Sequence, residues 1–288
     1  MLNEKSEEKP ENSAKRARMG VLLLCGFLIV FGIFVFDHIS KASLWSDEAT
    51  SANIIPYGFT DIWSKATSDA QPVFYIYMLK IWSLIGGDGA FALRLFSAFF
   101  AFVLVALIYA VSKEFFGNRV AITASAIAGT NYLLVWYATQ VRAYTLVAVL
   151  CLLSYYFFCK IMDGATRKQY AGYVAVTVCG LYAHTWFYFI FAAQILCAAL
   201  FCKRERSVPI TFVMVILLAI PGILASMHLN SLGANSWIGE VTTGTVLNSF
   251  IFLSYGSAAL YALYTFFRLF GLRPEPKPSF TANGTMCC

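Results

Sequence analysis

Charged residues are scarce in this chain. Lys, Arg, Asp and Glu together make up only 12% of its 288 residues, whereas 59% of the residues are hydrophobic. Soluble domains carry about 25% charged residues, so the composition excludes a soluble globular protein. It is typical of an integral membrane protein that crosses the bilayer several times, and we therefore predict an all-α fold.

The chain also lacks the cysteine spacing of a metal site. Six of its eight cysteines lie inside or at the ends of apolar runs, where we expect them to pack as small hydrophobic residues. A cleavable signal peptide is not indicated, because the polar segment 1–19 is long and the apolar run after it is close to a full span. We expect residues 1–19 to be a disordered cytoplasmic tail, held inside by the basic residues next to the first span.

Apolar runs long enough to cross about 30 Å of hydrocarbon recur along the chain. We predict about eight membrane-spanning helices, at residues 20–37, 90–112, 119–137, 143–162, 169–184, 185–202, 208–228 and 246–267. Together they form one transmembrane domain over residues 20–268. A cytoplasmic tail follows over residues 269–288.

One further apolar segment, residues 71–87, is short and carries Lys80 midway. It could span the bilayer or lie in the interface. If it lies in the interface, sixteen of the 21 Lys and Arg residues fall on the cytoplasmic side, as the positive-inside rule requires. We therefore predict a cytoplasmic N-terminus and a helical extracytoplasmic loop over residues 38–89, with an interfacial helix at 71–87.

This topology brings the unusual polar residues to one face of the membrane. Those at the extracytoplasmic ends of the spans are Asp47, Glu48, Arg94, Gln140, Arg142 and His184. Taken singly, each has an ordinary interpretation: an acid in a solvated loop, an arginine on a lipid phosphate, or a histidine at a helix end. Ionisable residues near hydrocarbon usually mark a site, and their common location favours a shared one.

These residue types suit one kind of reaction. Two arginines can hold a phosphate through fork-shaped, charge-assisted hydrogen bonds. A carboxylate within hydrogen-bond reach can take the proton from a hydroxyl nucleophile. Together they predict the displacement of a phosphate leaving group by an alcohol at the membrane surface.

Five segments of the chain resemble the GT-C glycosyltransferases, specifically the group of dolichyl-phosphate-mannose protein mannosyltransferases and bacterial lipid A aminoarabinose transferases. They are "LWSDEATS", "QPVFYIYMLKIWSLIGGDGAFALRLFSAFF", "KEFFGNRVA", "YATQVRAYTL" and "LYAHTWFYF", in family order between about residues 20 and 202. The resemblance implies a multi-span enzyme with a catalytic first extracytoplasmic loop. Such an enzyme moves a sugar from a polyprenyl-phosphate donor to the hydroxyl of a lipid, glycan or protein acceptor, with inversion.

The resemblance also implies roles for single residues. Asp47 would be the general base and Glu48 its acidic neighbour, while Arg94 would contact the donor phosphate or shape the site. The residues implied to bind donor phosphate or substrate are, besides Arg94, Gln71, Gln140, Arg142, Tyr144 and His184. Gln71 stands where the family often has a histidine, and the acidic pair would also suit a divalent metal ion.

Two alternatives to this enzyme stay open. A transporter or flippase for a phosphate-bearing lipid would use the same charges without chemistry. Transporters commonly show internal repeats and polar residues at the midplane of the membrane, and the sequence has no clear repeat. Members of the resembled group are usually longer than this chain, so a truncated, non-catalytic remnant is the other alternative.

Overall fold

The computed structural model describes residues 10–39, 43–69, 71–201, 207–231 and 242–244. In this part of the chain the regular secondary structure is α-helical, as predicted. The helices are α1 (Pro10–His38), α2 (Ser46–Ile54), α3 (Phe59–Ser68), α4 (Val73–Gly86), α5 (Ala90–Phe116), α6 (Asn118–Gly129), α7 (Tyr132–Ala138), α8 (Tyr144–Met162), α9 (Arg167–Ala183), α10 (Phe187–Phe201) and α11 (Ser207–Ser231).

Four helices are long and apolar enough to cross a membrane. They are Arg18–His38 of α1, all of α5, all of α8 and Ser207–Ala225 of α11, and a bent pair formed by α6 and α7 adds a fifth. The chain is therefore an integral, multi-pass membrane protein. The described residues support four or five spans rather than the predicted eight. The predicted span at 246–267 and the tail at 269–288 lie outside the described residues.

The predicted span at 119–137 is broken in the structure. Helix α6 ends at Gly129, α7 begins at Tyr132, and the two helices meet at an angle of 60°. Asn131 lies between them, and its side-chain oxygen accepts a hydrogen bond from the N–H of Leu134 at 3.1 Å. Asparagine is among the most favoured helix-capping residues, so the second helix starts at a signal inside the apolar run.

Two other expectations differ from the structure. Helix α1 begins at Pro10, so residues 10–19, predicted to be disordered, are helical. Proline is favoured at the first helical position, and the alanine, lysine and arginine that follow are good helix formers. Helices α9 and α10 match the predicted spans at 169–184 and 185–202 but have only 17 and 15 residues. At about 1.5 Å per residue both are shorter than the hydrocarbon core.

A buried polar cluster holds the two short helices beside α8. Ser154 of α8, Thr177 and Tyr173 of α9 and Gln194 of α10 are all buried. The Tyr173 hydroxyl donates to Gln194 Oε1 at 2.7 Å, the Gln194 amide donates to Ser154 Oγ at 3.1 Å, and the Ser154 and Thr177 hydroxyls are 3.0 Å apart. Hydrogen bonds between helices in lipid contribute about 0.6 kcal/mol each, so the cluster adds a modest stabilisation.

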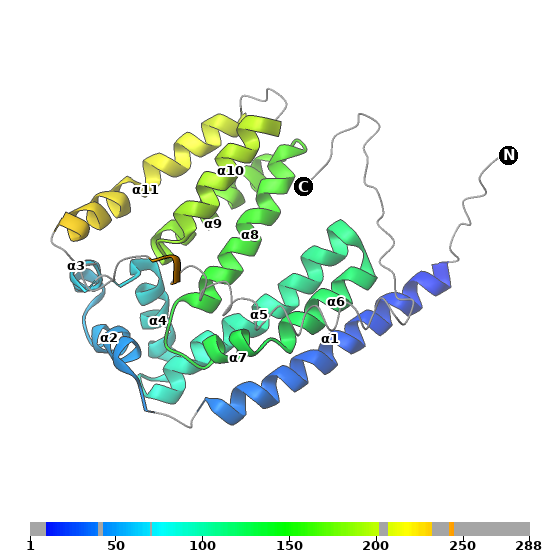
Figure 1. Ribbon diagram of the computed structural model, residues 1–288, viewed down its shortest axis with the longest axis horizontal. Coiled ribbons are helices and arrows are strands. Elements are labelled where there is room, and N and C mark those ends of the chain that lie inside the picture. Colours follow the sequence, from blue (N-terminus) through cyan, green and yellow to red (C-terminus); the bar gives the residue numbers. More distant parts are fainter. Residues whose placement is uncertain (1–9, 40–42, 70, 202–206, 232–241, 245–288) are drawn as a thin grey trace.

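The first loop is helical, as predicted, and consists of α2, α3 and α4. These short helices gather at one end of the long ones (Figure 1), where α4 packs against α3, α5 and α9. Tyr75, Ile76 and Leu79 on the inner face of α4 are fully buried in the core. The loop is therefore a packed part of the fold, and it carries Asp47 and Glu48.

Large apolar side chains cover the outside of the helices. Leu22, Ile29 and Ile33 of α1 and Leu217 and Leu224 of α11 are well exposed. Exposed apolar patches of this size are rare on soluble monomers, whereas lipid tails solvate them. The arrangement agrees with a helix bundle that faces hydrocarbon.

Candidate functional site

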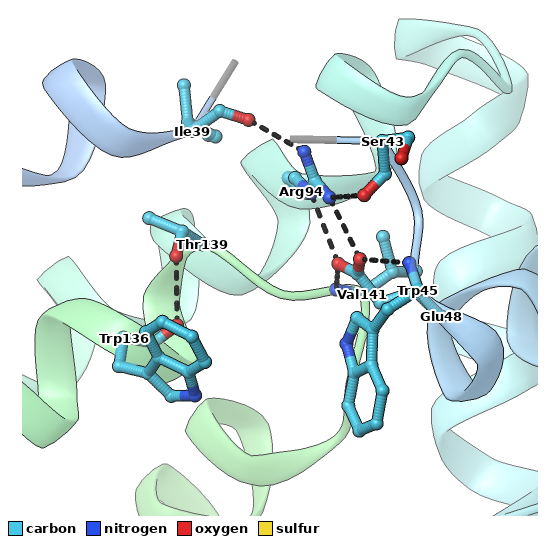
Figure 2. Close-up of polar contacts among 8 residues, drawn as sticks. All are labelled: Ile39, Ser43, Trp45, Glu48, Arg94, Trp136, Thr139 and Val141. Atoms are coloured by element: carbon cyan, nitrogen blue, oxygen red, sulfur yellow. Dashed lines mark hydrogen bonds and ion pairs between the residues drawn. The ribbon is translucent and has the colours of Figure 1, made fainter. Parts of the chain in front are cut away.

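The carboxylate of Glu48 lies at the start of α2 and is only 1% exposed. Its Oε1 accepts hydrogen bonds from Arg94 Nε at 3.1 Å and from the Val141 N–H at 2.7 Å. Its Oε2 accepts hydrogen bonds from Arg94 Nη2 at 2.8 Å and from the Trp45 N–H at 3.2 Å (Figure 2). One carboxylate thus joins the first loop, α5 and the α7–α8 loop.

Arg94 is directed entirely at groups of the protein itself. Besides the Glu48 carboxylate, its guanidinium donates to the carbonyl oxygen of Ile39 at 3.0 Å and to that of Ser43 at 3.1 Å (Figure 2). The side chain is buried. Of the two roles that the resemblance implies for Arg94, this geometry suits the shaping of the site.

Arg142 is held quite differently. Its Nη2 lies 3.5 Å from Asp47 Oδ2, and its Nη1 lies 3.5 Å from the Asp47 carbonyl oxygen and 3.4 Å from Gln71 Oε1. These distances exceed the 2.9 to 3.0 Å of a well-formed N–H···O bond. The side chain is 17% exposed, and the guanidinium lies 5.6 Å from the centre of the Tyr144 ring. Arg142 is therefore loosely held and can exchange these contacts for a ligand.

Asp47 has the most accessible carboxylate of the two acids, with 47% of its side chain exposed. It lies in the first turn of α2, one turn before the buried Ser51. The Ser51 hydroxyl donates to Gln71 Oε1 at 3.1 Å, so α2 places both Asp47 and Gln71 against Arg142. Ser51 was not predicted, although residues four apart share a helix face and its spacing from Asp47 is the signal for it.

The loop between α7 and α8 fixes the position of Arg142 through its backbone. The Arg142 N–H donates to the Gln140 carbonyl at 2.9 Å, and the Arg142 carbonyl accepts a hydrogen bond from Ser97 Oγ at 3.2 Å. Ser97, which was not predicted either, lies one turn after Arg94 on α5. Gln140 itself is buried and contributes to the site through this backbone contact.

His184 follows the last residue of α9 and completes the site. Its ring centre lies 5.8 Å from that of Tyr144, which in turn lies 4.6 Å from that of Tyr137. Burial, and secondarily the positive charge of Arg142, lower the pKa of His184. Its Nδ1 accepts a hydrogen bond from the Trp186 N–H at 3.2 Å. In the neutral ring the proton is then on Nε2, which makes that atom a donor.

The structure thus brings the eight predicted site residues into one connected set of contacts. Asp47, Gln71, Arg142, Tyr144 and His184 form its accessible part, and Glu48, Arg94 and the backbone of Gln140 lie behind them. In the part of the chain that the structure describes, no three His, Cys, Asp or Glu side chains are grouped so as to hold a metal ion. The divalent ion stays a prediction.

The comparisons with known proteins agree with this site. The sequence profile of a family described as dolichyl-phosphate-mannose-protein mannosyltransferase matches residues 70–228, more than half of the chain. The matched segment contains Gln71, Arg94, Gln140, Arg142, Tyr144 and His184, whereas Asp47 and Glu48 precede it. No curated protein and no solved structure matches the chain significantly. The family consists of membrane glycosyltransferases of the GT-C type, and on this match the chain belongs to the dolichyl-phosphate-mannose-protein mannosyltransferase family.

Proposed function

We propose that this protein transfers a sugar from a polyprenyl-phosphate donor to an acceptor hydroxyl at the extracytoplasmic face of the membrane, with inversion at the anomeric carbon. The observation that carries the proposal is the placement of Arg142. Its loosely held guanidinium lies between the accessible carboxylate of Asp47 and the ring pair of Tyr144 and His184. A base and an anion-binding group therefore adjoin each other.

Asp47 acts as the general base. Its carboxylate takes the proton of the acceptor hydroxyl while the hydroxyl oxygen forms a bond to the anomeric carbon. The bond from that carbon to the phosphate oxygen breaks at the same time, and its electron pair leaves with the polyprenyl phosphate. A single displacement from the opposite side of the carbon inverts its configuration.

Arg142 holds the donor phosphate. In place of its 3.5 Å contact with Asp47, its planar fork forms charge-assisted hydrogen bonds to phosphate oxygens. The same exchange frees the Asp47 carboxylate for the acceptor. His184 adds a neutral N–H donor from Nε2, and Gln71 orients Arg142 through its side-chain oxygen.

The acceptor is a lipid, glycan or protein hydroxyl that arrives from the extracytoplasmic side, and the N-terminus of the chain lies in the cytoplasm. This orientation is supported by the distribution of the basic residues. It places the phosphate-binding group at the membrane surface, where the phosphate of a membrane-anchored donor lies.

The test is a transfer assay on the purified protein with a panel of polyprenyl-phosphate sugars, comparing Asp47→Asn with the parent chain. Loss of the base should lower kcat by about 10²- to 10⁴-fold, with normal expression and membrane insertion. Asp61→Asn, which removes an exposed acid of the same loop in α3, is the matched control and should transfer normally. Wild-type transfer by Asp47→Asn would remove Asp47 from this role. Movement of the lipid-linked sugar across the bilayer without transfer would favour a flippase.

A further inference from the structure

Helix α2 carries Asp47 but is too short to hold its own position. It has nine residues, about 13 Å of helix, and isolated helices of that length are unstable in water. Its first turn is anchored through the Glu48 carboxylate. Its other end stops at Ile55, directly before Pro56, and needs an anchor of its own.

Lys80 of α4 supplies a contact at that end. Its Nζ donates a hydrogen bond of 2.6 Å to the carbonyl oxygen of Ile55, the residue that caps α2. The last carbonyls of a helix have no donor within the helix, and a positive charge is favourable beside them because of the helix dipole. Among the residues that the structure describes, no carboxylate forms an ion pair with Lys80. Its ammonium group therefore serves α2 rather than an acid.

A second contact from α4 holds the chain just beyond α2. The Tyr77 hydroxyl donates to the carbonyl oxygen of Phe59 at 3.1 Å, and the Tyr77 and Phe59 rings are stacked with their centres 6.3 Å apart. Tyr77 and Lys80 are three residues apart on α4 and so share one face. That face grips both sides of the turn between α2 and α3.

We propose that Lys80 is a positioning residue for Asp47. The two ends of α2 are held by two different charged side chains, Glu48 at the start and Lys80, from α4, at the end. With both ends fixed, the helix cannot tilt, and the Asp47 carboxylate keeps its place against Arg142. This inference rests on the proposed function, because it assigns Lys80 a part in presenting the base.

The first test compares Lys80→Met and Lys80→Arg in the transfer assay. A misplacement of about 1 Å at a reacting group lowers rates by up to about 10²-fold, so Lys80→Met should lower kcat about tenfold while KM changes less than about twofold. Lys80→Arg keeps a donor and a charge and should recover most of kcat. Lys65→Met, which removes an exposed lysine of α3, is the matched control and should behave like the parent chain.

The second test does not depend on activity. A cysteine placed by Ser46→Cys, at the exposed start of α2, is labelled with a membrane-impermeant maleimide in the Lys80→Met and parent backgrounds. Release of α2 should raise the labelling rate severalfold in Lys80→Met. If the parent chain transfers no sugar, the proposed function fails and this measurement still tests the position of α2.

Three results would overturn the inference. Unchanged kcat and labelling in Lys80→Met would show that the contact does not position α2. A raised KM for donor with unchanged kcat would make Lys80 a binding residue instead. A lowered thermal midpoint that accounts for all of the lost activity, with no recovery by Lys80→Arg, would make it a purely structural residue.

Discussion

Two arginines of this protein show how contacts separate residues of the same type. Arg94 is buried, with hydrogen bonds of 2.8 to 3.1 Å to a carboxylate and two carbonyls. Arg142 is partly exposed, and its nearest polar contacts lie at 3.4 to 3.5 Å. A guanidinium that is already saturated cannot bind a phosphate without breaking the fold, whereas a loosely held one can. We therefore assign stability to the first and ligand binding to the second.

This assignment predicts opposite effects of truncation. Arg94→Ala leaves the Glu48 carboxylate buried without its partner, and breaking a buried ion pair in this way costs about 3 to 5 kcal/mol. Arg142→Ala should change the free energy of unfolding by less than about 1 kcal/mol, because partly exposed pairs contribute little. Denaturant unfolding of the purified protein in detergent measures both. Equal losses of stability would contradict the distinction.

The same contrast should appear in donor binding. Removal of a hydrogen bond to a charged group costs about 1.5 to 3 kcal/mol, so Arg142→Ala should raise KM for the donor roughly 10- to 100-fold. Arg142→Lys should lose less, since it keeps the charge but not the fork geometry. Initial rates over a range of donor concentrations give KM for each variant. Parent-like values for both variants would remove Arg142 from phosphate binding.

Among the helices, α11 contains a break next to the site. Pro221 lies inside it and lacks the N–H that continues a helix. The Tyr182 hydroxyl, from the end of α9, enters the helix at this point: it donates to the Leu218 carbonyl at 3.0 Å and accepts a hydrogen bond from the Gly222 N–H at 3.3 Å. The Tyr182 ring also lies 6.1 Å from that of Trp63 on α3. Tyr182 thus links α9, α11 and the first loop, two residues before His184.

This junction leaves no room for a side chain at position 222. A Cβ added to Gly222 would lie 2.7 Å from Tyr182 Cε1, so Gly222→Ala should destabilise the fold by about 1 to 3 kcal/mol through overpacking. Gly26→Ala is the matched control, because nothing lies within 4 Å of its added Cβ. It should be neutral or stabilising, since alanine favours a helix over glycine. Thermal unfolding in detergent compares the two, and similar shifts would contradict the predicted contact.

The molecule as a whole is a bundle whose short helices α2, α3 and α4 gather at one end (Figure 1). The proposed chemistry requires this end to face the extracytoplasmic side. Gly87–Asp88 follows α4 at that end, while Arg167 and Lys168 begin α9 after the other end of α8. The two positions should therefore lie on opposite sides of the membrane.

Cysteine labelling of intact cells tests this orientation. Asp88→Cys should react with a membrane-impermeant maleimide, and Lys168→Cys should react only after the membrane is permeabilised, because basic loops stay in the cytoplasm. Both positions are exposed in the structure, so burial does not explain a difference between them. Labelling is measured against the parent chain, which has cysteines of its own. The reverse pattern would place the site on the cytoplasmic side and contradict the proposal.

Local patterns in the sequence predicted the class of protein and most of the helices. Few charges and long apolar runs require a lipid surroundings, and a helix is the way a single segment satisfies its backbone there. The break at Asn131 was not predicted, because an apolar run is read over about 19 residues and one capping residue inside it is easily outweighed. The shortness of α9 and α10 also depends on where neighbouring helices allow the turn at His184.

The sequence named the residues of the site, and only the tertiary structure separated their roles. Asp47, Glu48, Arg94 and Arg142 were predicted as one group, but nothing local distinguishes the two acids or the two arginines. The contacts that do so join residues 46, 71, 93 and 95 positions apart. Such contacts depend on how helices pack, and packing is set by the shapes of many side chains together. For the same reason Lys80 was only an odd charge in an apolar segment until the fold placed it at the end of α2.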